Sequence, residues 1–548
     1  MTNLDWAIVA GLMLLVFGFA GNRSLKTRTN VDWFLGGRTL PFWMVGVSMF
    51  ATSVDGGEYI AMNGATYKDG LVMISGLIFG VGVGGVIAAF LVVPTMYRTG
   101  LFTNAEYLEG RYGPGMRVIS ALVQIQYRTS ALAVVAVALH LIFTEVVHLD
   151  SQTAWLLVVL VAAGTTLYSA WGGLKTVAAA DVLLSAMMLS AIFVLWLAIW
   201  QQVGGLQGAT ETLVRQEGAA QAETLLRMGG QRAGRSPAAV VVIGWCLIAV
   251  GYFVVNHTQT MKMFGARSMW DLRMSVVVGS GLIILSGYFS STLGIFGRAL
   301  SPGLAQPDVI YPRLVDQYLG SGVKGIVVAG VIASAVSTFE GIGAALSAVF
   351  TRDIYGRFLV TGAQESHYLA VSRAATIMIV AVSFAYVPFI LVSSNIVDFF
   401  VRITSVFVTP LMTVYLMGVL TPANRRSGLV GLIAGAIYGL AASNLGGSAD
   451  APGLLPFWFT ERFAAYSWSV GITAAAMLAA SLLLGWDQQD ARPAARPSAW
   501  PAHSGEALPE MVASPFAAGR RVPWWAQPAL SAALLLTVSG YMVFGVLW

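Results

Sequence analysis

Charged residues are scarce in this sequence of 548 residues. Asp, Glu, Lys and Arg together make up 10% of the chain, whereas 57% is hydrophobic and the mean hydropathy is +0.74. A soluble globular domain carries roughly 25% charged residues. The composition therefore excludes a soluble protein and predicts an all-α polytopic membrane protein. The net charge of +5 fits basic cytoplasmic loops, so we expect the lipid bilayer, and no nucleic acid, as a partner.

Cysteine, histidine and nucleotide-binding motifs are also scarce or missing. Cys246 is the only cysteine, which excludes an intramolecular disulfide. The five histidines are scattered and offer no metal-ligand spacing. The sequence has no Gly-x-x-x-x-Gly-Lys-Ser/Thr motif for binding ATP, and it leaves no room for a soluble catalytic domain. We therefore expect neither an enzyme nor an organic cofactor.

Apolar runs predict fourteen spanning helices. The first run has no basic residue before it and no small-residue cleavage site after it, so we interpret it as a retained helix. A stretch rich in Pro, Ala and charge at 486–523 is predicted to be a cytoplasmic linker of low order. The predicted spans are residues 5–21, 40–66, 71–97, 115–147, 153–171, 176–203, 237–261, 274–298, 322–351, 368–392, 395–420, 427–445, 464–485 and 525–547.

The distribution of basic residues indicates the orientation of these spans. Loops rich in Lys and Arg alternate with short loops that contain few of them, and the positive-inside rule makes the basic loops cytoplasmic. We therefore predict a multi-pass protein of a bacterial-type inner (plasma) membrane with both termini on the outer side. The loop 204–236 falls on the outer side despite its four arginines, and its leucines indicate an interfacial amphipathic helix.

Two predicted spans contain interruptions that a regular helix would not have. In the span 40–66, Gly56 and Gly57 lie beside two carboxylates, and the span 237–261 contains the polar run 256–259. Adjacent glycines disfavour a continuous helix, but an unwound segment can line a cavity with its freed carbonyls. Interruptions five spans apart are typical of transporters built from two inverted five-helix repeats.

The span 322–351 carries oxygen-bearing side chains in its middle. Ser334, Ser337 and Thr338 fall within about one helical turn, and Glu340 follows closely. Hydroxyls and a loosened carbonyl at this depth suit a desolvated Na+, because hard cations prefer oxygen ligands. Alternatively, Ser and Thr serve only as small residues for helix packing.

Four motifs occur in order along the chain. They read Trp-Phe-Leu-Gly-Gly-Arg-Thr-Leu-Pro at 33–41, Tyr-Ser-Ala-Trp-Gly-Gly-Leu-Lys at 168–175 with Asp181, Ser-Ala-Val-Ser-Thr at 334–338 followed by Thr-Arg-Asp-Ile-Tyr at 351–355, and Thr-Pro-Ala-Asn-Arg-Arg at 421–426. Together they resemble the sodium/solute symporter family, which includes bacterial sodium/sugar, sodium/proline and sodium/sialic-acid symporters. The resemblance implies a LeuT-like core of two inverted five-helix repeats at 40–420. A leading helix and cytoplasmic loop at 1–39 would precede it, and three additional helices at 421–548 would follow.

The resemblance also implies a main sodium site. Its ligands would be the backbone carbonyls of Ala51, Val54 and Ser334 and the hydroxyls of Ser337 and Thr338. Ser334 stands where the family usually has alanine, which matters little for a carbonyl ligand. Thr338 replaces a serine and keeps the hydroxyl. We therefore expect this site to be intact and Na+ to be the coupling ion.

Ionisable residues within spans are functional candidates, because they are costly to bury in a membrane. Asp55 and Glu58 flank the predicted break, and Arg128 lies in the span 115–147. Each could contact substrate or ion. Alternatively, Asp55 and Glu58 pair with Arg128 or Lys262 and only hold the fold. Further candidates for the substrate cavity are Asn256, Tyr59 and Tyr252.

Asp181 and Glu340 form a possible second cation or proton site. Some relatives have an additional sodium site made by this aspartate and two serines, and the two serine positions are Glu340 and Gly341 here. Two neighbouring carboxylates in a low dielectric cannot both ionise cheaply, so a cation bridges them or one holds a proton. In the alternative interpretation, each carboxylate has a local arginine or hydroxyl partner.

The sequence thus predicts a sodium-coupled secondary active symporter that imports a small polar or charged organic solute by alternating access. A proton-coupled transporter of the same fold and a transport-inactive membrane sensor or regulatory subunit are the alternatives. The family handles sugars, amino acids, carboxylates and vitamins on one scaffold, so the fold does not fix the solute. The charged candidates in the cavity favour a zwitterionic or charged metabolite.

Overall fold

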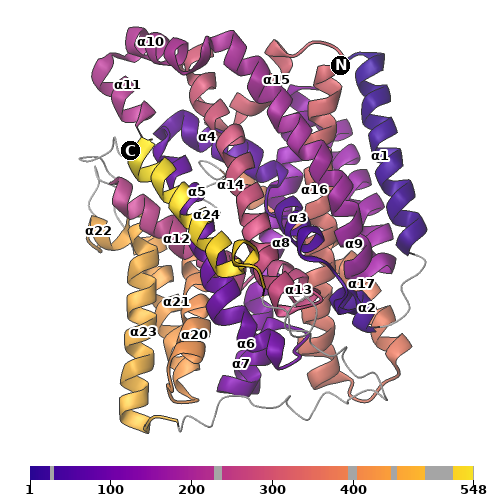
Figure 1. The fold of residues 1–548 in the computed structure, drawn as a ribbon, viewed down its shortest axis with the longest axis vertical. Coiled ribbons are helices and arrows are strands. Elements are labelled where there is room, and N and C mark those ends of the chain that lie inside the picture. The colour runs from indigo at the N-terminus through magenta and orange to yellow at the C-terminus, as the bar shows by residue number, and fades with distance from the viewer. Residues whose placement is uncertain are drawn as a thin grey trace.

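The computed structural model describes most of the chain as helix. It covers residues 1–24, 30–227, 237–392, 396, 401, 404–445, 453–487 and 522–546. Within these ranges, the only β-type pairing is an isolated bridge between Leu40 and Ala266. The regular elements are helices (Figure 1), which agrees with the all-helical prediction. The linker predicted at 486–523 lies outside the described residues except at its two ends.

The first part of the chain runs to the second broken span. Its helices are α1 (Asn3–Ser24), α2 (Asn30–Leu35), α3 (Phe42–Ala51), α4 (Gly56–Asp69), α5 (Val72–Ile87), α6 (Val93–Arg98), α7 (Asn104–Tyr112), α8 (Pro114–Glu145), α9 (Ser151–Val203), α10 (Gly205–Glu217), α11 (Ala219–Leu226), α12 (Ala238–Val254) and α13 (His257–Phe264). Helix α9 covers two predicted spans and is interrupted between them at Gly173, whose φ of 62° is one that glycine tolerates.

The second part contributes the central helix and the peripheral ones. These are α14 (Met269–Leu300), α15 (Ile310–Tyr318), α16 (Val323–Val349), α17 (Glu365–Ser383), α18 (Val387–Leu391), α20 (Thr409–Leu420), α21 (Ser427–Leu445), α22 (Phe457–Thr460), α23 (Ala464–Leu484) and α24 (Pro528–Tyr541). Ten described helices are long and apolar enough to cross a membrane, or eleven if the bent pair α12–α13 is one span. The other predicted spans fall on the second part of α9, on the short pair α3–α4 and on the short helix Thr404–Leu420, which explains the lower count.

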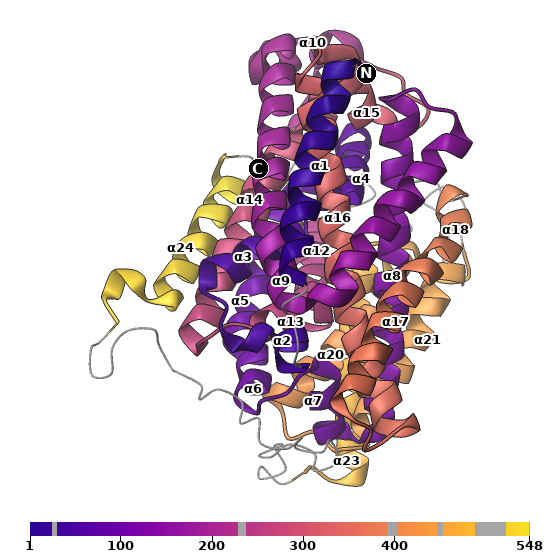
Figure 2. The same ribbon diagram turned by 90° about the vertical axis from the view of Figure 1, so that its right-hand side faces the viewer.

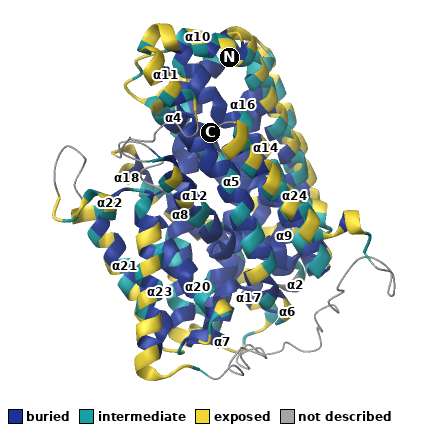
Figure 3. Ribbon diagram, turned by 60° about the vertical axis from the view of Figure 1, so that its left-hand side comes forward, coloured by how far each residue is buried: buried dark blue, intermediate teal, exposed yellow. Residues whose placement is uncertain are grey.

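Helix α16 lies at the centre of the bundle. Every residue from Val327 to Val349 is buried, and the helix packs against α1, α8, α9 and α17. A Cβ added at Gly330 would lie 2.2 Å from the Cβ of Ala191, so glycine allows α16 and α9 to approach closely. Burial on all sides fits a helix that is mostly apolar around its circumference, and Figure 3 shows buried residues filling the interior.

The outer surface of the bundle is rich in exposed apolar side chains, as contact with lipid requires. Helix α24 lies outside the bundle against α5 and α14, and α21 packs on α23 (Figure 2). Examples of exposed side chains on these and other outer helices are Leu14, Leu160, Ile437, Leu483 and Leu534.

The predicted amphipathic segment in the loop 204–236 is helical as far as the structure describes it. Helices α10 and α11 lie at the same end of the molecule as the N-terminus (Figure 1). Leu213 and Leu225 are buried there, while Arg215 and Glu223 are exposed.

Candidate functional site

The first broken span is interrupted where the glycines and carboxylates predict it. Helix α3 ends at Ala51 and α4 begins at Gly56. Asp55 is the N-cap of α4, and its side chain accepts a hydrogen bond of 2.9 Å from the backbone N–H of Glu58. The second broken span is also interrupted: its helices α12 and α13 are bent by 53° relative to each other.

The break between α3 and α4 lies against the middle of α16. A Cβ on the first residue of α4 would lie 3.8 Å from Ser334 Oγ, and a Cβ at Gly341 would lie 2.4 Å from Thr52 Cγ2. Among the described residues, no hydrogen bond reaches the carbonyl oxygens of Ala51 and Val54. These two carbonyls can therefore bind a cation without losing a protein partner.

The hydroxyls on the facing side of α16 are buried and already donate their protons. Thr338 Oγ1 donates to the carbonyl of Ser334 at 2.9 Å, and Ser337 Oγ donates to the carboxylate of Asp181 at 2.5 Å. A hydroxyl that donates its proton elsewhere keeps lone pairs for a cation. These hydroxyls and the free carbonyls are the oxygen ligands that Na+ prefers, so the predicted residues fit the ion.

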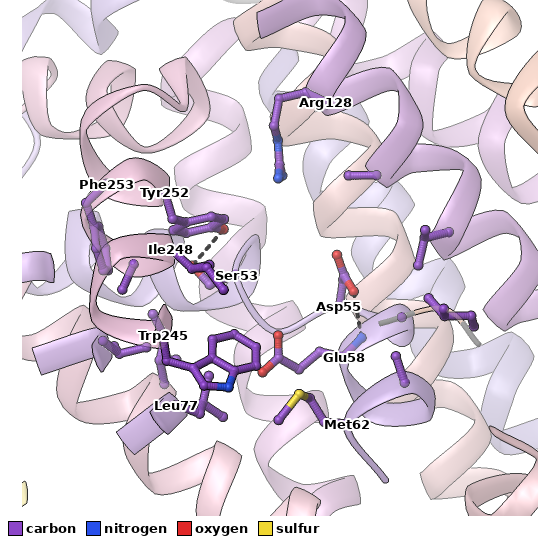
Figure 4. A pocket seen from close by; sticks show the side chains of 18 residues that line it. Ser53, Asp55, Glu58, Met62, Leu77, Arg128, Trp245, Ile248, Tyr252 and Phe253 are labelled. Carbon is purple, nitrogen blue, oxygen red and sulfur yellow. Dashed lines mark hydrogen bonds between the residues drawn. The ribbon is translucent and has the colours of Figure 1, made fainter. Parts of the chain in front are cut away.

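A cavity of about 140 Å³ opens beside the same break (Figure 4). Asp55, Glu58, Arg128 and Tyr252, four of the six candidates for the substrate cavity, line it. The rest of the wall is mostly apolar and is contributed by α5, α12 and α14, with Leu77, Val81, Trp245, Ile248, Phe253 and Ile283. The cavity is therefore amphipathic, with its charges gathered on α4 and α8.

Among the described residues, no ion pair joins the charged side chains of the cavity, although Arg128 and Asp55 interact electrostatically. Glu58 Oε1 has no hydrogen-bond partner among the described residues. The Arg128 guanidinium lies 5.6 Å from the centre of the Tyr252 ring and forms no ion pair with a described carboxylate. Figure 4 shows Arg128 pointing into the cavity from the side opposite Asp55 and Glu58. The described part of the chain thus lacks the ion pairs of the fold-holding interpretation, at least for Asp55 and Glu58 with Arg128 or Lys262.

Tyr252 connects the cavity wall to the break. Its hydroxyl donates to the carbonyl of Thr52 at 3.2 Å and to Ser53 Oγ at 3.1 Å. Gln259 of the polar run 256–259 also donates to Ser53 Oγ, at 3.1 Å, so the two broken spans touch beside the cavity.

Tyr59 and Asn256 do not line this cavity. Tyr59 stacks on Tyr311 with ring centres 5.8 Å apart. Asn256 is the N-cap of α13 and accepts a hydrogen bond from the backbone N–H of Thr258. A polar side chain at a helix break can thus satisfy the helix end without facing the cavity.

Asp181 in α9 is fully buried, with both carboxylate oxygens bound. Oδ1 accepts from Ser337, while Oδ2 accepts from Ser48 Oγ at 2.5 Å and from Lys262 Nζ at 3.1 Å. Lys262 is 1% exposed and also donates to the Ser48 carbonyl and to Thr52 Oγ1, each at 2.6 Å. The expected partners of Lys262 were Asp55 and Glu58, and the structure corrects this pairing to Asp181.

Glu340 lies in the same buried cluster. The hydroxyl of Tyr168 donates to Glu340 Oε2, and Oε1 has no partner among the described residues. Asp181 and Lys262 both act on Glu340 electrostatically. The two carboxylates predicted to form a pair are therefore neighbours, although each also has a hydroxyl partner.

A family model described as the sodium:solute symporter family matches residues 33–435, which is most of the chain. The chain belongs to the sodium:solute symporter family.

Curated relatives of this symporter are themselves cotransporters. It is 25% identical over 472 residues to sodium/glucose cotransporter 4 of Danio rerio, covering 79% of this chain and 70% of that protein. It is also 25% identical over 466 residues to sodium/myo-inositol cotransporter 2 of Rattus norvegicus, covering 78% and 68%. The symporter is therefore a multi-pass membrane transporter and not an enzyme, and it couples transport of a small solute to Na+.

Solved structures share the fold of the symporter. A substrate-bound, outward-open Na+-coupled sialic acid symporter has a TM-score of 0.75 at 19% identity, covering 89% of this chain and 99% of that one. A nucleobase-cation-symport-1 family transporter with bound bromovinylhydantoin has a TM-score of 0.53 at 13% identity, covering 86% and 99%.

The symporter also contains a buried ion-pair network that the sequence motifs do not reveal. Arg117 in α8 binds Glu106 at 3.1 Å and Glu109 at 2.6 Å, both in α7, and Asp353 at 2.7 Å beyond α16. The network joins three segments at the end of the bundle opposite α10 (Figure 2). Asp353 belongs to the motif 351–355, so this motif is the only part of the sequence pattern that pointed to the network.

Proposed function

We propose that this symporter imports a small polar or charged organic solute by alternating access across a bacterial-type inner membrane. The observation that carries the proposal is that the candidate Na+ ligands and the cavity meet at one helix break. Ala51 and Val54 precede Asp55, and Asp55 lines the cavity. An ion and a solute that both bind this break bias the same conformational equilibrium, which is the physical requirement for coupling.

The membrane topology proposed with this function has fourteen spans, with both termini outside. Its LeuT-like core of two inverted five-helix repeats occupies 40–420, after a leading helix within 1–39 and before three helices within 421–548. Two broken spans, five predicted spans apart, support the repeats. They touch through hydrogen bonds from Tyr252 and Gln259 to Ser53.

The proposed main sodium site consists of the carbonyls of Ala51, Val54 and Ser334 and the hydroxyls of Ser337 and Thr338. The free carbonyls of Ala51 and Val54 support this assignment, as do the hydroxyls of Ser337 and Thr338, which donate their protons and keep lone pairs for the ion. When bound, the ion supplies positive charge that holds α3–α4 against α16. The broken span α3–α4 and helix α16 contribute separate ligands, so the ion would be released when they move apart.

The cavity favours a zwitterionic solute with an apolar body. Glu58 offers a carboxylate oxygen without a protein partner, and Arg128 faces it from α8. A solute with an amine and a carboxylate would satisfy both, while its apolar part would contact Trp245 and Ile248. A neutral polar solute would leave the charges unpaired in a low dielectric, which is unfavourable.

We also propose that Asp181 and Glu340 hold a second positive charge, as a cation or a proton. Their proximity and the unpartnered oxygen of Glu340 support this role. The same cluster is the specific observation that keeps proton coupling as a second candidate.

Thermal unfolding of the purified protein tests the proposal first. We expect Na+ to raise the unfolding temperature relative to K+ and choline at equal ionic strength, because a ligand that binds the native state stabilises it. The double variant Ser337→Ala/Thr338→Ala should lose this difference. Uptake into proteoliposomes under an imposed Na+ gradient should then follow for amino-acid-like solutes. A folded protein without a sodium-specific shift would favour proton coupling or a sensor.

A further inference from the structure

The ammonium of Lys262 is held as a bound metal ion would be. A lysine ammonium has three N–H donors, and here each has an oxygen acceptor. The three acceptors are a carboxylate of Asp181 at 3.1 Å, the carbonyl of Ser48 at 2.6 Å and the hydroxyl of Thr52 at 2.6 Å. Carboxylate, carbonyl and hydroxyl oxygens are also the ligands of a hard cation. The ammonium is buried, so solvent supplies none of its partners.

The Lys262 ammonium contacts neighbours of the proposed sodium site on both of its sides, α3–α4 and α16. Thr52 is the residue after Ala51, whose carbonyl is a proposed ligand. On the other side, Ser337 donates to Asp181, and Asp181 accepts from Lys262. The segment that would bind Na+ and the segment that binds Lys262 are thus neighbours in the same break.

The charges of the cluster leave little room for another ion while Lys262 is in place. Both oxygens of Asp181 are bound, and the ammonium occupies the space between Asp181, Ser48 and Thr52. A Na+ bound there as well would share one carboxylate with the ammonium and would repel it in a low dielectric. Glu340 is the remaining carboxylate, and Tyr168 already binds one of its oxygens.

We infer that Lys262 is a built-in cation that fills the second cation position beside Asp181, so that the symporter binds a single Na+. This inference rests on the proposed main sodium site. It identifies the Lys262 ammonium as the second positive charge that we propose for Asp181 and Glu340. Removing the ammonium while keeping Asp181 should open the position to a second Na+.

Equilibrium binding of radioactive ²²Na+ to the purified protein tests this inference. The wild type should saturate at one Na+ per chain and Lys262→Met at two, while Lys262→Met/Asp181→Asn should return to one. Lys175→Met is the matched control, because Lys175 is exposed on α9, and it should bind one.

The possible results separate the inference from the proposed function. Two Na+ per wild-type chain, or one in a folded Lys262→Met protein, would overturn the inference and leave sodium coupling standing. Absence of Na+ binding in the wild type would overturn both. Two Na+ per wild-type chain would overturn the inference whether or not Lys262→Met folds.

Discussion

Two buried sites beside the first broken span, the Asp181 cluster and the cavity, differ in how their charges are partnered. Around Asp181, the chain supplies an ammonium and two serine hydroxyls, so the carboxylate is fully bound. In the central cavity, Glu58 and Arg128 face each other without an ion pair. A buried charge without a partner is unfavourable unless something else supplies one. The difference therefore separates a site completed by the protein from the cavity that we propose a solute completes.

The largest expected effect comes from breaking the completed site. Asp181→Asn or Lys262→Met alone should each lower the free energy of unfolding by about 3–5 kcal/mol, because each leaves a buried partner uncompensated. The double variant should recover most of this loss. Thermal unfolding of the wild type, the two single variants and the double variant in choline chloride measures these changes in stability. Additive losses in the double variant would show that the two residues do not act as a pair.

The response of the two single variants to Na+ tests whether the ion can take the place of the ammonium. If Na+ can replace the ammonium, Na+ should restore more stability to Lys262→Met than to Asp181→Asn, since only the former keeps the carboxylate ligand. Equal responses of the two variants to Na+ would contradict this expectation.

The second effect concerns the site left open for a ligand. Glu58→Gln should weaken binding of an amine-bearing solute by about 1.5–3 kcal/mol, the range for a hydrogen bond to a charged group. It should leave the stability of the solute-free protein nearly unchanged, because Glu58 Oε1 has no described partner to lose. Competition for uptake in proteoliposomes gives the affinity, and thermal unfolding gives the stability. A large loss of stability without a change in affinity would instead make Glu58 a structural residue.

Arg128 tests the other end of the solute. Arg128→Met should weaken binding of solutes that carry a carboxylate, with little effect on analogues in which that group is an amide. Met62→Leu is a suitable control, because Met62 lines the cavity without a charge and the exchange nearly conserves volume. An equal loss for both types of solute would exclude a direct carboxylate contact.

A smaller effect is expected at the proposed sodium site. Thr338→Val replaces a hydroxyl by a methyl group of similar size, so it removes one ligand oxygen with little change in shape. We expect the Na+ dissociation constant to rise at least tenfold, which corresponds to about 1.4 kcal/mol. Thr338→Ser, which keeps the hydroxyl, should stay close to the wild type. Similar Na+ affinities for Val and Ser would remove Thr338 from the ligand set.

Much of this arrangement could be predicted from the sequence, because it depends on local chemistry. Gly56-Gly57 beside carboxylates predicted the break, and the hydroxyls of Ser337 and Thr338 predicted a polar patch in a buried helix. The pairing of Lys262 could not be predicted in this way. Lys262 lies in α13, beyond the 53° bend from α12, and its partner Asp181 lies 81 residues earlier in the chain. The buried position of Arg117 likewise depends on contacts between distant segments.

The smallest effects compare two buried tyrosines near the break. Tyr252→Phe should lower stability by about 1 kcal/mol and alter solute binding, because its hydroxyl donates to Thr52 and Ser53 at the cavity wall. Tyr59→Phe should leave stability unchanged or slightly raise it, because the Tyr59 hydroxyl is buried without a described partner and its ring keeps the stacking on Tyr311. Thermal unfolding and solute competition on the two variants measure both effects. If Tyr59→Phe weakened solute binding as much as Tyr252→Phe did, the solute would reach beyond the present cavity wall, and the unpartnered Tyr59 hydroxyl would then belong to the ligand-completed site.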